Sequence, residues 1–245
     1  MRYTLSNNII ETANKVSKIP FAKSLLKPIY YPYKKFLQRR RNEHFRRHAL
    51  EALMRFDQCL SENGFEYTLA FGTMLGAIRE KGFIKHDLDI DVAMWNDQYS
   101  PQLRHCLETS GFSLIHSFEG DNGKLGREET YCWNDINIDI FYFYPPLREL
   151  PYCCDFIGQP GCPTYRMCMK KYGGALPRRI ELPMTKERVK VQFEDIELFV
   201  PSNAKEILSF RYGPDYMTPR KDWTIGSYDT HITPWNEKLG IFKEF

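Results

Sequence analysis

The chain of 245 residues lacks several features that mark specialised classes of protein. It has no run approaching the roughly 18 apolar residues that a membrane-spanning helix needs, and no internal repeat or low-complexity block. The N-terminal residues lack the compact apolar core and small-residue cleavage site of a secretory signal, so we expect a cytoplasmic protein. Hydrophobic residues make up 42% and charged residues 27%, which excludes a disordered or collagen-like polymer.

Cysteine is present but in a number and spacing that do not indicate a disulfide framework. The chain has seven cysteines, and without a secretory signal we expect reduced thiols. Four of them share one stretch and could hold zinc, but their spacing differs from the paired two-residue spacing of common zinc sites, so reduced thiols are the favoured interpretation. These four are Cys153, Cys154, Cys162 and Cys168.

Positive charge is concentrated near the N-terminus. From Lys15 to Arg47 there are eleven Lys and Arg residues and a single acidic residue, Glu43, interleaved with aromatic and aliphatic side chains. Such a segment suits an anionic membrane surface, where each nearby cation contributes about 1 kcal/mol. A solvated arm that packs on the domain is the alternative, and nucleic acid is a third option that we do not expect.

We therefore predict a basic, partly helical arm over residues 1–43 and a peripheral location on the cytosolic face of the membrane. Three prolines, at Pro20, Pro28 and Pro32, are expected to interrupt any single long helix here.

Residues 44–245 show the pattern of an α+β domain, with a mixed β-sheet flanked by helices. Helical spacing covers residues 44–63, and further helices are predicted at 74–80, 99–110 and 203–212. Strands are predicted at 67–71, 88–94, 112–118, 129–133 and 136–144, and a hairpin at 189–200 that turns at Glu194 and Asp195. Residues 145–188 are rich in Pro, Gly and Cys, which predicts loops.

Two of the predicted strands carry acidic residues opposite their apolar face. In residues 88–94 alternate positions are apolar and favour the core, so Asp89 and Asp91 project together from the other face. Asp139 opposes a row of isoleucines in the same way. If the two strands are neighbours, three carboxylates meet and could hold a hard divalent cation. An isolated Asp-x-Asp is more often a solvated strand face.

A glycine and a threonine stand at a predicted strand-to-helix turn just upstream. Gly72 allows the backbone to approach a phosphate closely, and the N–H groups at a helix start favour an anion. Alone, Gly72 and Thr73 are typical of an ordinary turn. In the order strand, Gly-Thr, short helix, Asp-x-Asp strand and later Asp-bearing strand, the set is much more specific.

This ordered set resembles the nucleotidyltransferase superfamily and, more narrowly, the LicD family, which includes bacterial phosphocholine transferases and more distantly fukutin and fukutin-related protein. The resemblance rests on FGTMLGAIREKGFI at residues 71–84, DLDID at 87–91, FEDIELFVP at 193–201 and YGPDY at 212–216. It covers about residues 56–223 and does not include the basic arm.

The resemblance implies transfer of a substituted phosphate, such as phosphocholine, phosphoethanolamine or a polyol phosphate, from a CDP-linked donor to a hydroxyl group. The acceptor would be a cell-surface glycan or a lipid-linked oligosaccharide. It also implies Mg²⁺ (or Mn²⁺) at Asp89, Asp91 and Asp139, with Asp139 accepting the proton of the acceptor hydroxyl by analogy with the superfamily.

The same resemblance assigns roles to residues around the metal. Gly72 and Thr73 would hold a donor phosphate, and Arg79 or Lys81 would steady it by charge-assisted hydrogen bonds. A solvated helix end is the alternative for Arg79 and Lys81. Asp87 is either a carboxylate that supports the metal ligands or a surface residue, and we favour the supporting role.

Two other functions fit parts of the pattern. A nucleotidyltransferase would move a nucleoside monophosphate onto a small molecule or protein. A non-catalytic protein would bind anionic lipid or nucleic acid through residues 15–47, but such a protein has no reason to keep the metal carboxylates.

Overall fold

The computed structural model describes residues 20–85, 87–219, 232–234 and 239–245. The chain divides into two compact units, residues 1–47 and residues 48–245. Helix α2 (Pro20–Glu62) contributes residues to both. Residues 1–19 of the predicted basic arm lie outside the described residues, so their structure stays a prediction.

Helix α2 is continuous over 43 residues, so the expectation that its prolines would interrupt it is wrong. Pro20 is the first residue of the helix, where no backbone N–H is required. Pro28 and Pro32 are four residues apart and therefore lie on one side of the helix.

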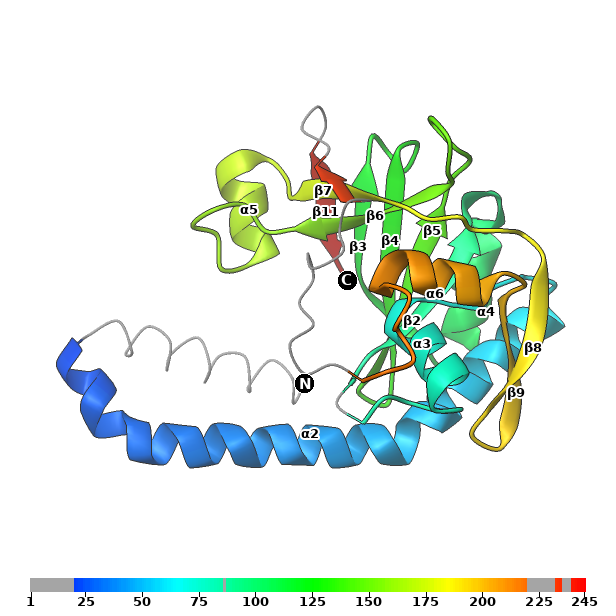
Figure 1. Cartoon of the computed structure of the whole chain (residues 1–245). Helices are drawn as coiled ribbons and strands as arrows, with labels where there is room; N and C mark the ends of the chain where they lie inside the picture. Colours follow the sequence, from blue (N-terminus) through cyan, green and yellow to red (C-terminus); the bar gives the residue numbers. More distant parts are fainter. Residues whose placement is uncertain (1–19, 86, 220–231, 235–238) are drawn as a thin grey trace. The chain divides into compact units, whose positions relative to one another are not determined.

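The second unit is built around a mixed six-stranded sheet in the order β1-β2-β5-β4-β3-β11 (Figure 1). Among the described strands, β2 and β5 form the parallel pair of this sheet, and its other neighbouring pairs are antiparallel. The predicted α+β class with a mixed sheet is confirmed. The strands are β1 (Thr68–Leu69), β2 (Ile90–Trp95), β3 (Ser113–Gly120), β4 (Gly126–Trp133), β5 (Ile136–Phe143) and β11 (Gly240–Glu244).

One face of the sheet is apolar and packs against helices. Ile90, Ile138 and Ile140 are fully buried on this face. Tyr142 on the same face contacts Tyr99 edge to face, at the approach to helix α4 (Pro101–Thr109). Val92 completes the buried row of β2, as the alternation in the sequence predicts. A short 3₁₀ helix, η1 (Asn96–Gln98), follows β2.

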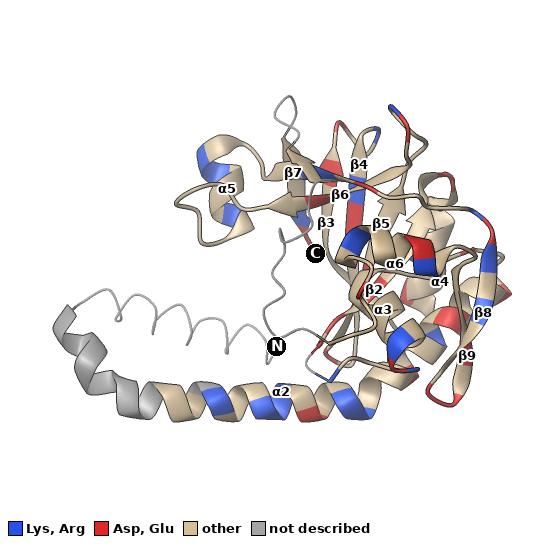
Figure 2. Cartoon of the chain, in the orientation of Figure 1, with Lys and Arg blue, Asp and Glu red and all other residues tan. Residues whose placement is uncertain are grey.

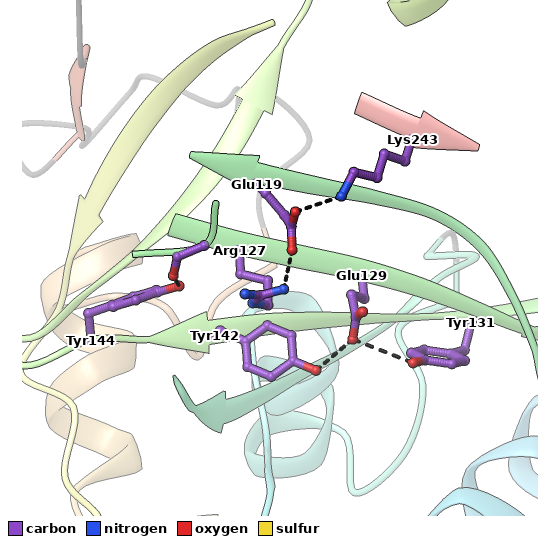
Figure 3. Close-up of polar contacts among 8 residues, drawn as sticks. Glu119, Arg127, Glu129, Tyr131, Tyr142, Tyr144 and Lys243 are labelled. Atoms are coloured by element: carbon purple, nitrogen blue, oxygen red, sulfur yellow. Dashed lines mark hydrogen bonds and ion pairs between the residues drawn. The ribbon is translucent and has the colours of Figure 1, made fainter. Parts of the chain in front are cut away.

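A buried polar network crosses the same face and joins four strands (Figure 3). Glu129 of β4 accepts hydrogen bonds from the hydroxyls of Tyr142 (2.7 Å) and Tyr131 (3.5 Å). Glu119 of β3 contacts Arg127 of β4 and accepts from Lys243 of β11 at 2.9 Å. Because buried charges are stable only when paired, this network fixes the register of the strands that carry it.

The stretch 145–188 is more regular than the predicted loops. It contains β6 (Tyr152–Ile157), α5 (Tyr165–Tyr172) and β7 (Leu176–Glu181), and β7 also pairs with β10 (Ile232–Pro234). Cys153 and Cys154 are buried in β6, where they pack as small apolar residues. Phe156 of β6 stacks on Phe118 of β3 with ring centroids 5.0 Å apart, so this small sheet lies against the second face of the central sheet.

The predicted hairpin is confirmed as β8 (Arg188–Phe193) and β9 (Ile196–Pro201), turning at Glu194 and Asp195. Helices α3 (Phe71–Arg79) and α6 (Ala204–Tyr212) match the predicted helices closely and lie side by side next to β2 (Figure 1). Strands β10 and β11 near the C-terminus were not predicted. Within the described residues, no helix has an apolar stretch long enough to span a lipid bilayer.

Candidate metal centre

The parallel pairing of β2 and β5 brings the three predicted carboxylates together. Asp91 stands directly opposite Asp139 in the register of the two strands, on the face away from the buried isoleucines. Asp89 lies just before β2. One carboxylate oxygen from each of the three lies within 4.8 Å of the other two.

The start of α3 holds Asp91 in place through its backbone. The hydroxyl of Thr73 accepts a hydrogen bond from the N–H of Asp91 at 2.9 Å, and the N–H of Ala70 donates to the carbonyl of Asp91 at 3.0 Å. The predicted Gly-Thr turn is therefore the first turn of α3, and Thr73 is buried against β2. Its role at a donor phosphate stays a prediction.

Gly72 provides the room that the carboxylates need. A Cβ atom at this position would lie 2.3 Å from an oxygen of Asp87 and 3.7 Å from an oxygen of Asp91. The N–H of Gly72 also donates to the carboxylate of Asp91, which favours the ionised form. Any side chain here would displace Asp87, which forms a hydrogen bond with Asp89 behind the site.

Burial and mutual repulsion raise the proton affinity of the aspartates at this site. Burial, followed by the hydrogen bond and then the charge of Asp89, raises the pKa of Asp87 to about 7. Burial raises the pKa of Asp139 to about 6, against the lowering effect of a hydrogen bond from Thr130. Burial and the charges of Asp89, Asp139 and Asp87 raise the pKa of Asp91 well above its ordinary value.

A hydrogen-bonded row continues from Asp139 across the sheet. Thr130 of β4 lies opposite Asp139, and its hydroxyl donates to the Asp139 carboxylate. His116 of β3 lies opposite Thr130, with its Nε2 atom 2.8 Å from the same hydroxyl. Because the hydroxyl donates its one proton to Asp139, Nε2 of His116 must be the protonated nitrogen. Neither Thr130 nor His116 was predicted from the sequence, although each falls on the acidic face of a strand.

Glu128 is a further carboxylate that the sequence analysis missed. It precedes Thr130 by two residues on β4, so the two share a face. Burial and the charges of Asp139, Asp155 and Asp91 raise its pKa well above the ordinary value. Alternation along β4 could have identified it once Asp139 was assigned to the neighbouring strand.

The two predicted phosphate ligands, Arg79 and Lys81, contact other parts of the protein. Arg79 pairs with Glu80 at 2.8 Å and donates to the carbonyl of Tyr216 at 3.3 Å. Lys81 is exposed, and its carbonyl accepts from the N–H of Glu194 in the β8–β9 turn. Both residues join the end of α3 to neighbouring segments.

The four clustered cysteines do not converge. Cys153 and Cys154 are adjacent in a strand and so point to opposite faces, and Cys168 lies on α5. Among the residues that the structure describes, the group placed to hold a metal ion is the aspartate trio and not these sulfurs. The zinc site considered from the sequence therefore has no support. All seven cysteines are free thiols.

The aspartate trio fits a hard divalent cation. Within the described part of the chain, Asp89, Asp91 and Asp139 form no ion pair with Lys or Arg. Three oxygen ligands and strong mutual repulsion match the preference of Mg²⁺ or Mn²⁺ for carboxylates.

Comparison with known proteins identifies relatives in several animals. A mouse (Mus musculus) protein named ribitol-5-phosphate transferase FKTN is 26% identical over 209 residues, which cover 81% of this chain and 41% of that protein. The human (Homo sapiens) protein of the same name is 25% identical over the same shares. An uncharacterized Caenorhabditis elegans protein, T07A5.1, is 35% identical over 114 residues, covering 45% of this chain and 30% of that protein. The chain thus spans about two-fifths of the length of the FKTN relatives.

A family model described as LicD/FKTN/FKRP, nucleotidyltransferase domain, matches residues 64–203. This range contains α3, the aspartate trio, Thr130 and the β8–β9 hairpin. The chain therefore belongs to the LicD/FKTN/FKRP nucleotidyltransferase-domain family.

Proposed function

We propose that this protein is a metal-dependent phosphotransferase that moves a substituted phosphate from a CDP-linked donor to a hydroxyl of a glycan. The convergence of Asp89, Asp91 and Asp139 beside the first turn of α3 is the observation that carries the proposal. Because the FKTN relatives are named ribitol-5-phosphate transferases, a polyol phosphate is the favoured group among phosphocholine, phosphoethanolamine and polyol phosphate.

The three aspartates would hold the cation, Mg²⁺ or Mn²⁺. When bound, the ion would supply positive charge to the phosphate oxygens and so stabilise the transition state. Gly72 and Thr73 keep Asp91 fixed, which limits the reorganisation that binding requires.

Asp139 would accept the proton of the acceptor hydroxyl. The hydroxyl oxygen attacks the phosphorus atom that carries the substituent, the bond from that phosphorus to CMP breaks, and CMP leaves. The pKa of Asp139, raised to about 6 by burial, leaves the carboxylate mostly ionised at pH 7, and a bound cation would favour this ionised, proton-accepting form further.

Substitution of the aspartates tests the proposal. Asp89→Asn and Asp91→Asn should each abolish CMP release from CDP-ribitol, CDP-glycerol, CDP-choline and CDP-ethanolamine in the presence of an acceptor, while the melting temperature stays near that of the wild type. Asp195→Asn, in the exposed β8–β9 turn, is the matched control and should retain full activity. If both active-site variants unfold, the carboxylates are structural and the proposal fails.

The family description also leaves room for nucleotidyl transfer as a second candidate. The two reactions differ in the leaving group, since a nucleotidyltransferase releases diphosphate from a nucleoside triphosphate. Diphosphate release with triphosphates, and no CMP release with any CDP-linked donor, would favour this second function.

We also propose that the arm contacts an anionic membrane surface. In the described part of α2, Tyr31, Tyr33 and Phe36 are exposed, and Lys and Arg recur along the helix (Figure 2). Vesicles that contain phosphatidylserine should therefore bind the protein, and phosphatidylcholine vesicles should not. Deletion of residues 1–43 should remove this binding and leave turnover of a soluble acceptor unchanged, and loss of turnover instead would argue against an anchor.

A further inference from the structure

The proposed donor carries a diphosphate, but the site that would receive it is strongly acidic. Four aspartates and Glu128 lie on or behind the same face, and a single divalent ion would not neutralise them. An anionic ligand would therefore need a cationic side chain at this site as well.

Most arginines on the elements that flank the site already contact a carboxylate. Arg178 pairs with Asp155, and Arg179 lies 3.2 Å from Glu181. Arg79 pairs with Glu80. A charge that is held by a neighbouring carboxylate is less able to attract a phosphate, because the ligand would have to replace an existing partner.

Arg211 differs from these arginines. It lies in the last turn of α6, and within the described residues it forms no ion pair with a carboxylate. Its Nε atom, like that of Arg179, is buried and has no hydrogen-bond acceptor among the residues that the structure describes. A buried guanidinium N–H without an acceptor is costly, and an anionic ligand would satisfy it.

The position of Arg211 is fixed by the residue that begins α3. The guanidinium carbon lies 4.7 Å from the centroid of the Phe71 ring, and Phe71 directly precedes Gly72. The Phe71 ring packs at right angles on Phe141, with centroids 4.7 Å apart. Phe141 follows Asp139 by two residues on the same face of β5, so the stack places Arg211 above the acidic face.

Tyr212 links Arg211 electrostatically to the aspartates. Burial raises the pKa of the Tyr212 hydroxyl to about 12, and both Arg211 and the carboxylates of Asp91 and Asp87 act on it. Arg211 and Tyr212 are also the charged and hydroxyl-bearing side chains of a small pocket whose other walls, such as Phe71 and Ile207, are apolar. A few convergent polar groups in an apolar pocket are typical of a ligand site.

We propose that Arg211 binds the diphosphate of the nucleotide-linked donor, an inference that rests on the proposed function. Its planar fork can donate two N–H groups to phosphate oxygens, and the stack on Phe71 holds the fork in one orientation before the ligand arrives. Arg211 would thus take the role that the family resemblance implies for Arg79 or Lys81.

Titration calorimetry of the full chain with Mg²⁺–CDP and with Mg²⁺–pyrophosphate tests this assignment. Arg211→Met keeps most of the side-chain volume and removes the charge, and it should weaken binding of both probes about 10- to 100-fold. Arg211→Lys keeps the charge without the fork and should bind with intermediate affinity. Arg188→Met is the matched control, since Arg188 also stacks on an aromatic ring, Phe199 at 4.0 Å, but lies on β8 and pairs with Glu66.

Wild-type affinity in Arg211→Met, or loss of affinity in Arg79→Met with Arg211→Met unaffected, would overturn the assignment. Failure of the wild type to bind either probe would do the same. Circular dichroism and melting temperature establish that each variant is folded, and Arg211→Lys provides the test if Arg211→Met is not. If CDP binding depends on Arg211 but no CDP-linked donor releases CMP, the phosphate site stands and the transferase proposal fails.

Discussion

The position of the Asp139 carboxylate depends on two neighbouring side chains that take no direct part in the proposed reaction. Thr130 donates to its carboxylate, and His116 holds the Thr130 hydroxyl from the other side. The hydrogen bond from Thr130 restrains the carboxylate and lowers its pKa, in opposition to burial. A base that is also a metal ligand needs this kind of restraint, because its two oxygens must serve different partners.

Thr130→Val should therefore slow transfer without unfolding the protein. Loss of a hydrogen bond to a charged group costs about 1.5–3 kcal/mol, so we expect kcat to fall roughly 10- to 100-fold while the KM for the donor changes little. Without this bond the pKa of Asp139 rises, and the acidic limb of the pH–rate profile should move to higher pH. Thr130→Ser retains the hydroxyl and should restore both properties, and an unchanged rate in Thr130→Val would refute the positioning role.

At the scale of the strands, the polar network of the opposite face secures the sheet that carries the site. Glu119 and Arg127 are largely buried, and Lys243 connects β11 to the pair. The ring of Tyr99 lies against the guanidinium of Arg127, with the guanidinium carbon 3.3 Å from the ring centroid. These contacts join β3, β4 and the C-terminal strand.

Arg127→Met should destabilise the fold by about 3 kcal/mol, because it leaves the carboxylate of Glu119 without its buried partner. Urea unfolding followed by circular dichroism measures this loss. Lys243→Met removes a cation that is half exposed and should cost less than about 1 kcal/mol. Equal stability of the two variants would show that burial does not govern the strength of this network.

Strand alternation was sufficient to predict which side chains share a face. It placed Asp89 and Asp91 together and set Asp139 opposite the isoleucines, and the structure agrees. It could not predict that β2 and β5 are neighbours in register, because that pairing depends on the packing of the complete sheet. The family resemblance supplied this step before the structure did.

The features that were not predicted from the sequence were missed for physical reasons. Cys153 and Cys154 are buried strand residues, but in a segment rich in Pro and Gly they resembled loop thiols. Arg211 looks in the sequence like any solvated arginine at a helix end, and only the packing of α6 on Phe71 gives it a distinct position. Pro28 and Pro32 predict an interruption because each lacks a backbone N–H, but the helix continues through both.

For the whole molecule, the acidic centre makes stability depend on pH and on metal together. Folding raises the pKa of Asp139 to about 6 and that of Asp87 to about 7, from 3.8 in each case. The folded protein therefore binds more protons than the unfolded chain between about pH 4 and pH 7. The stability from these groups is fully present below pH 4 and is lost as pH rises through 6 and 7.

Mg²⁺ should reverse this loss, because it binds the ionised carboxylates and competes with protons. We expect the ion to raise the melting temperature more at pH 8 than at pH 5.5, as measured by scanning calorimetry. Asp89→Asn should abolish the difference, since it removes one ligand and part of the repulsion. An equal increase at both values, or one that persists in Asp89→Asn, would exclude the aspartate trio as the binding site.

The parallel pairing of β2 with β5 has a consequence for the time course of folding. Its two strands become neighbours only after the chain has passed through α4, β3 and β4, so the ligand set is incomplete in any intermediate that lacks β5. Contacts that form after the rate-limiting barrier change the rate of unfolding and leave the rate of folding almost untouched. If the pairing of β2 with β5 forms after that barrier, a bound cation would prolong the lifetime of the native state, and the protein would resist proteolysis longer in its presence without folding any faster.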